Sequence, residues 1–211
     1  METRMKGTLI TFEGSEGSGK STQIESVCKY LKRKKKPILF VREPGGVKIS
    51  EKIRNILLDV RNTKMSSECE TLLYMAARAQ LVEEVVAPAV KAGRIVLCDR
   101  FLDSTVAYQG YGNGVDVKAI KNMGKFATQE IQPDITFFFD IDAKKGLSRI
   151  KGRAKDRIER RAIRYHNRVR EGYTEIARRE PGRVKLIDAN RTKEEIFAVV
   201  RKHIDRLLKL H

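Results

Sequence analysis

Short apolar runs alternate with longer segments of helical spacing along most of the chain. The runs expected to form strands are Thr8–Glu13, Pro37–Arg42, Arg94–Asp99, Asp134–Asp140 and Arg183–Asp188. The segments expected to form helices are Ser21–Arg33, Val47–Leu58, Ser66–Lys91, Phe101–Tyr108, Asp116–Glu130, Ala143–Ile150, Ile158–Arg179 and Lys193–Leu208. Nearly continuous apolar strands that alternate with helices are typical of a parallel sheet covered on both faces. We therefore predict an α/β fold, with a five-stranded parallel sheet flanked by helices.

The length and composition favour one domain. The chain has 211 residues, and it contains no Pro/Ser/Gly linker, repeat or low-complexity tract, so we expect a single domain over residues 1–211. Residues 1–6 are charged, unlike a signal peptide, and no apolar run approaches the ~20 residues of a membrane helix. The cysteines Cys28, Cys69 and Cys98 are odd in number and lack metal-ligand spacing. These features predict a cytoplasmic protein without a membrane partner.

The strongest local signal is a phosphate-binding loop. The segment consists of Gly14, Ser15, Glu16, Gly17, Ser18, Gly19, Lys20 and Ser21, and it is followed by Thr22. It fits G-x-x-x-x-G-K-[ST] and lies between a predicted strand and a predicted helix, as that motif requires. Glycines let backbone N–H groups surround a phosphate, and the helix N-terminus adds partial positive charge. We expect Lys20 to reach the outer phosphates and the Ser21 hydroxyl to face Mg²⁺.

Charged residues also follow two other predicted strands. Arg42 and Glu43 precede Pro44 and two glycines, which mark a tight loop. Asp99 and Arg100 end the third strand, where phosphate-binding kinases place an acidic group near Mg²⁺. Ligands of parallel sheets bind at the carboxyl ends of strands, although polarity normally returns there in any protein. The two segments are therefore candidate ligand contacts, or turns with charged flanks.

Two further groups share helical faces or a helix end. Tyr74 and Arg78 lie four residues apart on a predicted helix, so their side chains share one face. The ring and the guanidinium could stack on a base and bond its edge, or they could belong to core packing and a surface ion pair. Thr105, Tyr108 and Gln109 follow on a helix that we expect to break at the nearby glycines. Polar groups there either read the edge of a substrate or belong to an ordinary helix end.

The charge of the chain points to polyanionic ligands. The formal net charge is +17, from 44 basic and 27 acidic residues. Such an excess suits an enzyme with two phosphorylated substrates, or a nucleic-acid-binding protein. Ten basic residues lie between positions 149 and 170, with Gly152 among them. This run is typical of a mobile lid over a triphosphate or of a solvated helix face.

Taken in order, the motifs resemble the thymidylate kinase family, a group of P-loop nucleoside-monophosphate kinases. The resemblance covers nearly the whole chain. It rests on the Phe12-Glu13-Gly14 start of the P-loop, Arg42-Glu43-Pro44-Gly45-Gly46, Ala76-Ala77-Arg78, Asp99-Arg100-Phe101 with Ser104-Thr105 and Ala107-Tyr108-Gln109-Gly110, and Asp156-Arg157-Ile158-Glu159. It implies phosphoryl transfer from ATP to dTMP, with no general base because the acceptor phosphate is already ionised.

The resemblance also implies roles for single residues. Tyr74 would stack on the base, Arg78, Thr105 and Gln109 would bond its polar atoms, and Tyr108 would crowd the ribose 2′ position. Arg54, Arg100 and Arg42 would hold the acceptor phosphate, with Glu43 beside them. Glu16 would face the acceptor and its metal, and Arg149 would pack near adenine. Because the P-loop carries no arginine, a lid at about residues 149–161 would supply the catalytic cation from Arg153 or Arg157. Mg²⁺ would lie near Ser21 and Asp99, and a homodimer would form through the helix Ser66–Lys91.

Three alternatives remain at this point. Another nucleoside-monophosphate kinase would share the P-loop. A deoxynucleoside kinase would need a carboxylate base such as Glu43, but the clamp of Arg54 and Arg100 would then have no ligand. A nucleic-acid-binding P-loop ATPase would suit the charge, but aromatic residues do not interleave with the basic ones. We therefore expect no stable nucleic-acid partner.

Overall fold

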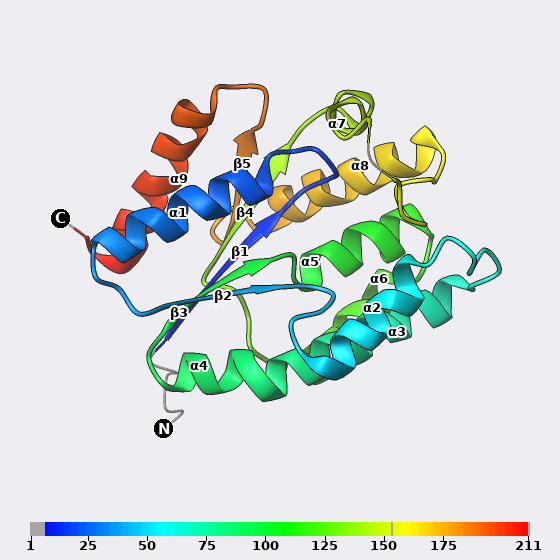
Figure 1. Ribbon diagram of the computed structural model, residues 1–211, viewed down its shortest axis with the longest axis horizontal. Helices are drawn as coiled ribbons and strands as arrows, with labels where there is room; N and C mark the ends of the chain where they lie inside the picture. Colours follow the sequence, from blue (N-terminus) through cyan, green and yellow to red (C-terminus); the bar gives the residue numbers. More distant parts are fainter. Residues whose placement is uncertain (1–6, 153, 211) are drawn as a thin grey trace.

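The computed structural model describes residues 7–152 and 154–210. In this part of the chain, five parallel strands form one sheet in the order β2-β3-β1-β4-β5 (Figure 1). The strands are β1 (Thr8–Glu13), β2 (Ile38–Arg42), β3 (Ile95–Asp99), β4 (Ile135–Asp140) and β5 (Val184–Asp188). The predicted α/β class and the parallel sheet are confirmed.

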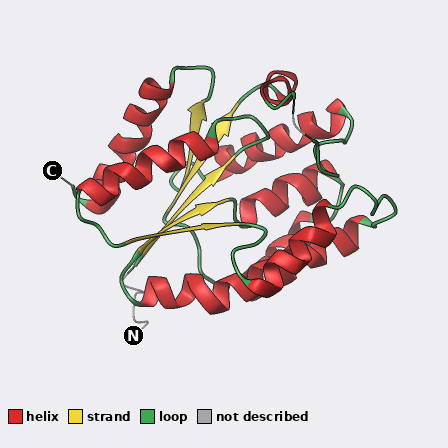
Figure 2. Cartoon of the chain, in the orientation of Figure 1, coloured by secondary structure: helices red, strands yellow, loops and turns green. Residues whose placement is uncertain are grey.

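Helical segments connect the strands (Figure 2). The α-helices are α1 (Lys20–Arg33), α2 (Lys48–Leu58), α3 (Ser67–Leu81), α4 (Ala87–Lys91), α5 (Leu102–Thr105), α6 (Val117–Ala127), α7 (Ala143–Arg149), α8 (Ile163–Arg179) and α9 (Lys193–Leu208). Two π-helical turns, η1 (Val82–Val86) and η2 (Val106–Gly112), continue α3 and α5. No helix among these described segments is long and apolar enough to cross a membrane.

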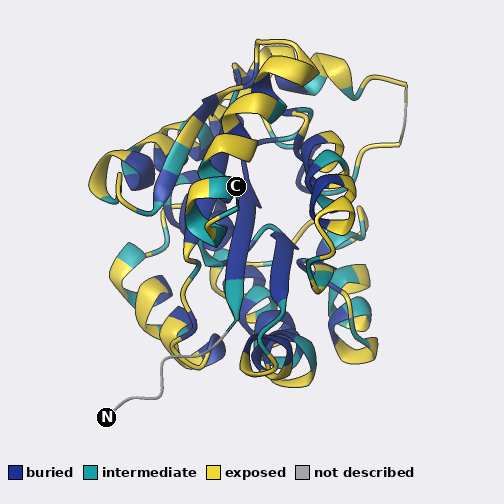
Figure 3. Ribbon diagram, turned by 90° about the vertical axis from the view of Figure 1, so that its left-hand side faces the viewer, coloured by how far each residue is buried: buried dark blue, intermediate teal, exposed yellow. Residues whose placement is uncertain are grey.

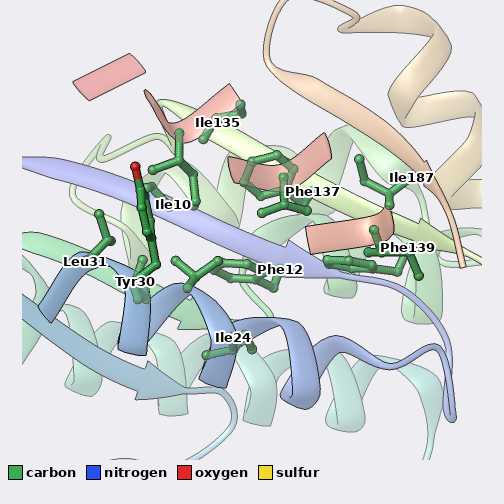
Figure 4. Packing of buried hydrophobic residues seen from close by; sticks show 14 of the residues in the cluster. Ile10, Phe12, Ile24, Tyr30, Leu31, Ile135, Phe137, Phe139 and Ile187 are labelled. Carbon is green, nitrogen blue, oxygen red and sulfur yellow. The ribbon is translucent and has the colours of Figure 1, made fainter. Parts of the chain in front are cut away.

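Both faces of the central strands β1, β3 and β4 are buried, which explains why these strands are apolar at nearly every position. Along β4, Phe137 and Phe139 join the cluster under α1 and α9, whereas Phe138 joins the cluster under α8 and η2. Figure 4 shows the first cluster, in which Ile24 of α1 faces the strand residues. The central strands are buried, and the outer faces of the surrounding helices are exposed (Figure 3).

The segment predicted as one helix, Ser66–Lys91, is interrupted. Pro88 has no N–H to donate to the carbonyl of Glu84, so a regular helix cannot continue through it. The chain widens into η1 instead, and the N–H of Ala87 bonds the carbonyl of Val82, five residues back. Helix α4 then begins with the proline in its first turn.

Two other predicted boundaries are wrong. The helix predicted to end at Tyr108 continues as η2 to Gly112, and the chain leaves it at Asn113, still within the segment of three glycines that was expected to end it. Gly112 serves close packing: a Cβ there would lie 2.6 Å from the ring of Tyr165 on α8. At the other end, α8 begins at Ile163 rather than Ile158, because residues 157–160 form turns around Asp156.

The sheet brings the charged strand ends together. Asp99 of β3 pairs in register with Phe12 of β1 on one side and with Arg42 of β2 on the other. The residues that follow these strands therefore meet at one edge of the sheet. The strand arrowheads in Figure 1 point toward the part of the molecule that holds α5, α7 and the start of α8.

Candidate active site

A cleft of about 500 Å³ lies at the carboxyl edge of the sheet. It extends from the P-loop to α3 and η2, and most of the residues predicted for ligand binding line it. These are Glu16, Gly17, Ser18, Gly19, Lys20, Ser21, Thr22, Glu43, Arg54, Tyr74, Arg78, Asp99, Arg100, Thr105, Tyr108, Gln109 and Arg149.

The P-loop encloses Lys20, the first residue of α1. Gly19 precedes it in the left-handed region, with φ of 87°, which lets the chain turn directly into the helix. The Lys20 ammonium donates to the carbonyls of Gly14 and Ser15 at 2.8 and 2.9 Å, and to Ser18 Oγ at 3.3 Å. Burial, together with the charge of Arg100, lowers the pKa of Lys20 to about 8. The loop thus brings a cation to the N-terminus of α1, a combination that suits phosphates.

Arg149 lies at the end of α7, beside the loop. Its guanidinium donates to the carbonyl of Gly17 at 3.3 Å and to that of Ala189 at 3.4 Å. These contacts fix the side chain over the outer side of the P-loop, within the lining of the cleft.

Glu16 organises the centre of the cleft. Its Oε1 accepts from Tyr108 Oη at 2.6 Å and from Arg100 at 3.2 Å. Its Oε2 lies 3.6 Å from Nδ1 of His166, a buried residue of α8. Burial alone would raise the pKa of Glu16, but the nearby His166 ring, Arg100 and Lys20 lower it to about 2. An ionised carboxylate therefore holds Arg100 and Tyr108 in place.

Arg100 approaches from the end of β3. Its backbone adopts the left-handed region, with φ of 70°, which is costly for a residue with a Cβ and is often found at functional sites. The guanidinium lies 5.0 Å from the centre of the Tyr108 ring and donates to Ser104 and Tyr173 at 3.2 and 3.3 Å. Packing and hydrogen bonds therefore hold this cation in the lining of the cleft.

Glu13, at the end of β1, binds two of the residues that hold Arg100, namely Ser104 and Tyr173. Its carboxyl accepts from the Phe101 N–H at 2.7 Å, from Ser104 Oγ at 2.6 Å and from Tyr173 Oη at 2.9 Å. Complete burial, reinforced by the charge of Asp103, raises its pKa to about 7.

Arg78 and Glu43 form a buried ion pair at the far end of the cleft. Their atoms lie 2.8 Å apart, and the side chains are 2% and 4% exposed. Arg78 also donates to Thr105 Oγ1 and to the carbonyl of Phe101, both at 3.0 Å. Burial raises the pKa of Glu43. These contacts lock Arg78 in a fixed orientation beside Tyr74, which also lines the cleft.

Gln109 is held by a residue that the sequence reasoning did not select. Its Nε2 donates at 2.9 Å to Oε1 of Glu70, a fully buried residue of α3. Arg157 and Arg161 lie at 2.6 and 2.8 Å from Oε2 of the same carboxylate. His166 was missed as well. A charged residue within the apolar stripe of a helix was the available signal for Glu70, but its partners are distant in sequence.

Not every predicted residue reaches the cleft. Arg42 bonds Glu51 at 2.8 Å and the carbonyl of Pro44, and it is absent from the lining. Arg54 also donates to the Pro44 carbonyl, at 2.9 Å, but lines the cleft. Arg157 points to Glu70 and to the Leu57 carbonyl instead of the P-loop. Arg153 lies outside the described residues.

The oxygen ligands available to a metal are few. Within the described residues, no group of three or more His, Cys, Asp or Glu side chains gathers as a metal cage. Asp99 Oδ1 is buried without a hydrogen-bond partner, and both Asp99 and Ser21 line the cleft next to the P-loop. This donor set fits Mg²⁺ carried by substrate phosphates, which uses one or two protein oxygens.

Comparison with known proteins agrees with this geometry. The family model described as thymidylate kinase matches residues 12–200. A thymidylate kinase of Bacillus velezensis is 43% identical over 208 residues, which cover 97% of this chain and 98% of that protein. A thymidylate kinase of Halothermothrix orenii is 46% identical over 196 residues, 91% of this chain and 93% of that protein.

Among solved structures, a thymidylate kinase from Ehrlichia chaffeensis is similar, with a TM-score of 0.76 and 32% identity. The match covers 94% of this chain and 98% of that one. The chain therefore belongs to the thymidylate kinase family.

Proposed function

We infer that this protein transfers the terminal phosphoryl group of ATP to dTMP, giving dTDP and ADP. The observation that carries this conclusion is one continuous cleft that joins a P-loop to a pocket lined by Tyr74, Arg78 and Gln109. The first end fits a nucleoside triphosphate, and the second offers a ring, a fixed cation and an amide to a base. Arg100 lies between them, where the two phosphates would meet.

At the donor end, the backbone N–H groups of the P-loop and the ammonium of Lys20 bind the β- and γ-phosphates. Lys20 exchanges the loop carbonyls for phosphate oxygens when ATP binds, and the added negative charge restores its protonated state. Arg149 covers the adenine side of the site. Ser21 and Asp99 would hold Mg²⁺, which neutralises phosphate charge when it is bound.

At the acceptor end, Tyr74 stacks on thymine, while Arg78, Thr105 and Gln109 bond its polar atoms. Tyr108 excludes a ribose 2′-hydroxyl, because Glu16 holds its ring against the sugar position. Arg100 and Arg54 bind the acceptor phosphate. Arg42 supports the site without binding the phosphate, since its bond to the Pro44 carbonyl holds the loop that carries Glu43.

The chemistry needs alignment and charge compensation. An ionised oxygen of the dTMP phosphate attacks the γ-phosphorus of ATP, and the bond to the β-bridging oxygen breaks to release ADP. Lys20 and Arg100 stabilise the charge on the transferring group, so that no side chain has to accept a proton. An arginine of the lid would be the third cation that stabilises this charge. Arg153 is the candidate because Arg157 is bound to Glu70.

The test is ADP release with each nucleoside monophosphate and with thymidine. We expect dTMP to give the highest kcat/KM, and thymidine to be inactive because Glu43 is occupied by Arg78 and is not placed as a base. Faster turnover of dGMP, CMP or AMP would contradict the assignment of the acceptor. Turnover of thymidine would instead favour a deoxynucleoside kinase.

We also propose a homodimer in the cytoplasm. Leu72 of α3 and Phe126 of α6 are 56% and 87% exposed on helices that contact each other, which leaves an apolar surface for a second copy. Sedimentation of the wild type and of Phe126→Glu would test this, and a dimer that survives the substitution would exclude this surface. The thiols of Cys28, Cys69 and Cys98 are unpaired, as a reducing compartment favours.

A further inference from the structure

Glu70 is a fully buried carboxylate, and both of its oxygens have partners. Its Oε1 accepts from the amides of Gln109 and Asn113, at 2.9 and 2.8 Å. Its Oε2 faces the guanidiniums of Arg157 and Arg161. Oε1 thus has two hydrogen-bond donors, whereas Oε2 accepts a hydrogen bond from Arg161 at 2.8 Å and forms an ion pair with Arg157 at 2.6 Å.

This arrangement fixes the orientation of the Gln109 amide. A carboxylate beside two guanidiniums has no hydrogen to donate, so it can bond only the NH₂ end of an amide. The Nε2 of Gln109 must therefore face Glu70. Because Gln109 lines the cleft, its remaining polar atom for a ligand is the carbonyl oxygen Oε1, which only accepts.

The same cleft is lined by Arg78, whose guanidinium only donates and is locked by Glu43. Thymine presents a carbonyl oxygen and an adjacent ring N–H, which complement this donor and acceptor. Cytosine presents an amino group and a bare ring nitrogen at the same positions, so both contacts would be mismatched. Arg78 cannot reverse its polarity, whereas Gln109 could do so by turning its amide.

We propose that Glu70 is a positioning residue that sets base selectivity, by holding the amide of Gln109 as an acceptor for a ring N–H. The inference rests on the proposed acceptor site. Glu70 does not line the cleft, so it acts through Gln109 and makes no contact with the nucleotide.

The sharpest test is Glu70→Gln. Arg157 and Arg161 only donate hydrogen bonds, so the oxygen of the new amide must face them. Its NH₂ must then face Gln109. Gln109 then turns its own oxygen away from the cleft and presents its NH₂ to the base. We expect kcat/KM for dTMP relative to dCMP to fall by at least about tenfold, since a buried polar contact is reversed. The matched control, Arg161→Gln, removes a partner of Oε2 and a donor to Asn113 but makes no contact with Gln109, so it should keep the ratio within about twofold.

The ratio should be measured with both nucleotides competing in one preparation, because the fraction of folded enzyme then cancels. If Glu70→Gln yields no soluble protein, Glu70→Asp is measured in the same way: it keeps the charge for the arginines but shortens the reach to Gln109, so the ratio should also fall. An unchanged ratio in whichever variant is measured, with a wild type that selects dTMP, overturns the proposal alone. A wild type that uses dCMP as well as dTMP overturns the acceptor site and the proposal together.

A double-variant cycle separates positioning from general damage. In the Gln109→Met background the amide is gone, so Glu70→Gln should leave the dTMP to dCMP ratio unchanged. A further fall of the ratio in that background would show that Glu70 acts by another route, and would refute the role through Gln109.

Discussion

Replacement of Glu13 by Gln should make the protein more stable at neutral and alkaline pH. The carboxyl is completely buried, and its pKa rises from 4.5 to about 7. Between these values the unfolded chain has lost the proton of Glu13, whereas the folded protein keeps it. A rising pH therefore favours the unfolded state across this interval, and the loss is complete above about pH 7.

The magnitude follows from the width of the interval. A difference of about 2.5 pH units corresponds to about 3 kcal/mol of unfolding free energy. Glu13→Gln does not titrate and so avoids this loss. Its amide fits the site, because one end accepts from the Phe101 N–H and the hydroxyls of Ser104 and Tyr173 can accept from the other.

The assay is urea unfolding of wild type and variant from about pH 5 to about pH 8. We expect the stability of the variant relative to wild type to increase with pH, by about 2.5 kcal/mol between pH 5 and pH 8. Glu16→Gln is the matched control, since Glu16 has a pKa of about 2 and stays ionised in both states over this range. If the Glu13→Gln difference stays constant within about 0.5 kcal/mol from pH 5 to pH 8, the burial argument fails.

The remaining predictions concern the phosphate cations. Lys20→Ala should lower kcat at least about 100-fold with little change in the urea midpoint, because its ammonium bonds only loop atoms; an active, folded variant would discard the P-loop assignment. Affinity for ATP, measured by calorimetry, should decrease above about pH 8 as free Lys20 loses its proton, and constant affinity to about pH 9.5 would contradict this. Arg153→Ala should lower kcat more than it changes KM, whereas Arg157→Ala should mainly lower the melting temperature because it exposes Glu70; the reverse pattern would make Arg157 the catalytic cation.

The fold could be predicted from the sequence because its signals are local. Each strand was located within one residue of its observed start, since buried parallel strands are continuous apolar runs bounded by charged residues. The errors occurred where a local rule has two structural outcomes. Pro88 ended a regular helix by widening it, and η2 passed through Gly110 and ended only at Gly112, where the missing Cβ allows close packing.

The site was predictable only in part, for the same reason. The P-loop is contiguous, so its spacing alone indicates both its conformation and its ligand. Glu70 and His166 acquire their roles from partners that lie 39 and 150 residues away, Gln109 and Glu16. No single-sequence pattern encodes such pairs, because helical or strand periodicity reports which face is buried but not which groups meet there.

The basic run at residues 149–170 illustrates the consequence for function. By composition, every arginine in it is an equal candidate for the catalytic cation. In the structure, Arg157 and Arg161 pair with Glu70, and Arg170 pairs with Asp140. Glu70 is buried, so at least one of its two arginines must stay with it: a Glu70 carboxylate left unpaired would cost several kcal/mol. A positive segment therefore shows where phosphates are attracted, but the acidic partners decide which cations remain available to them.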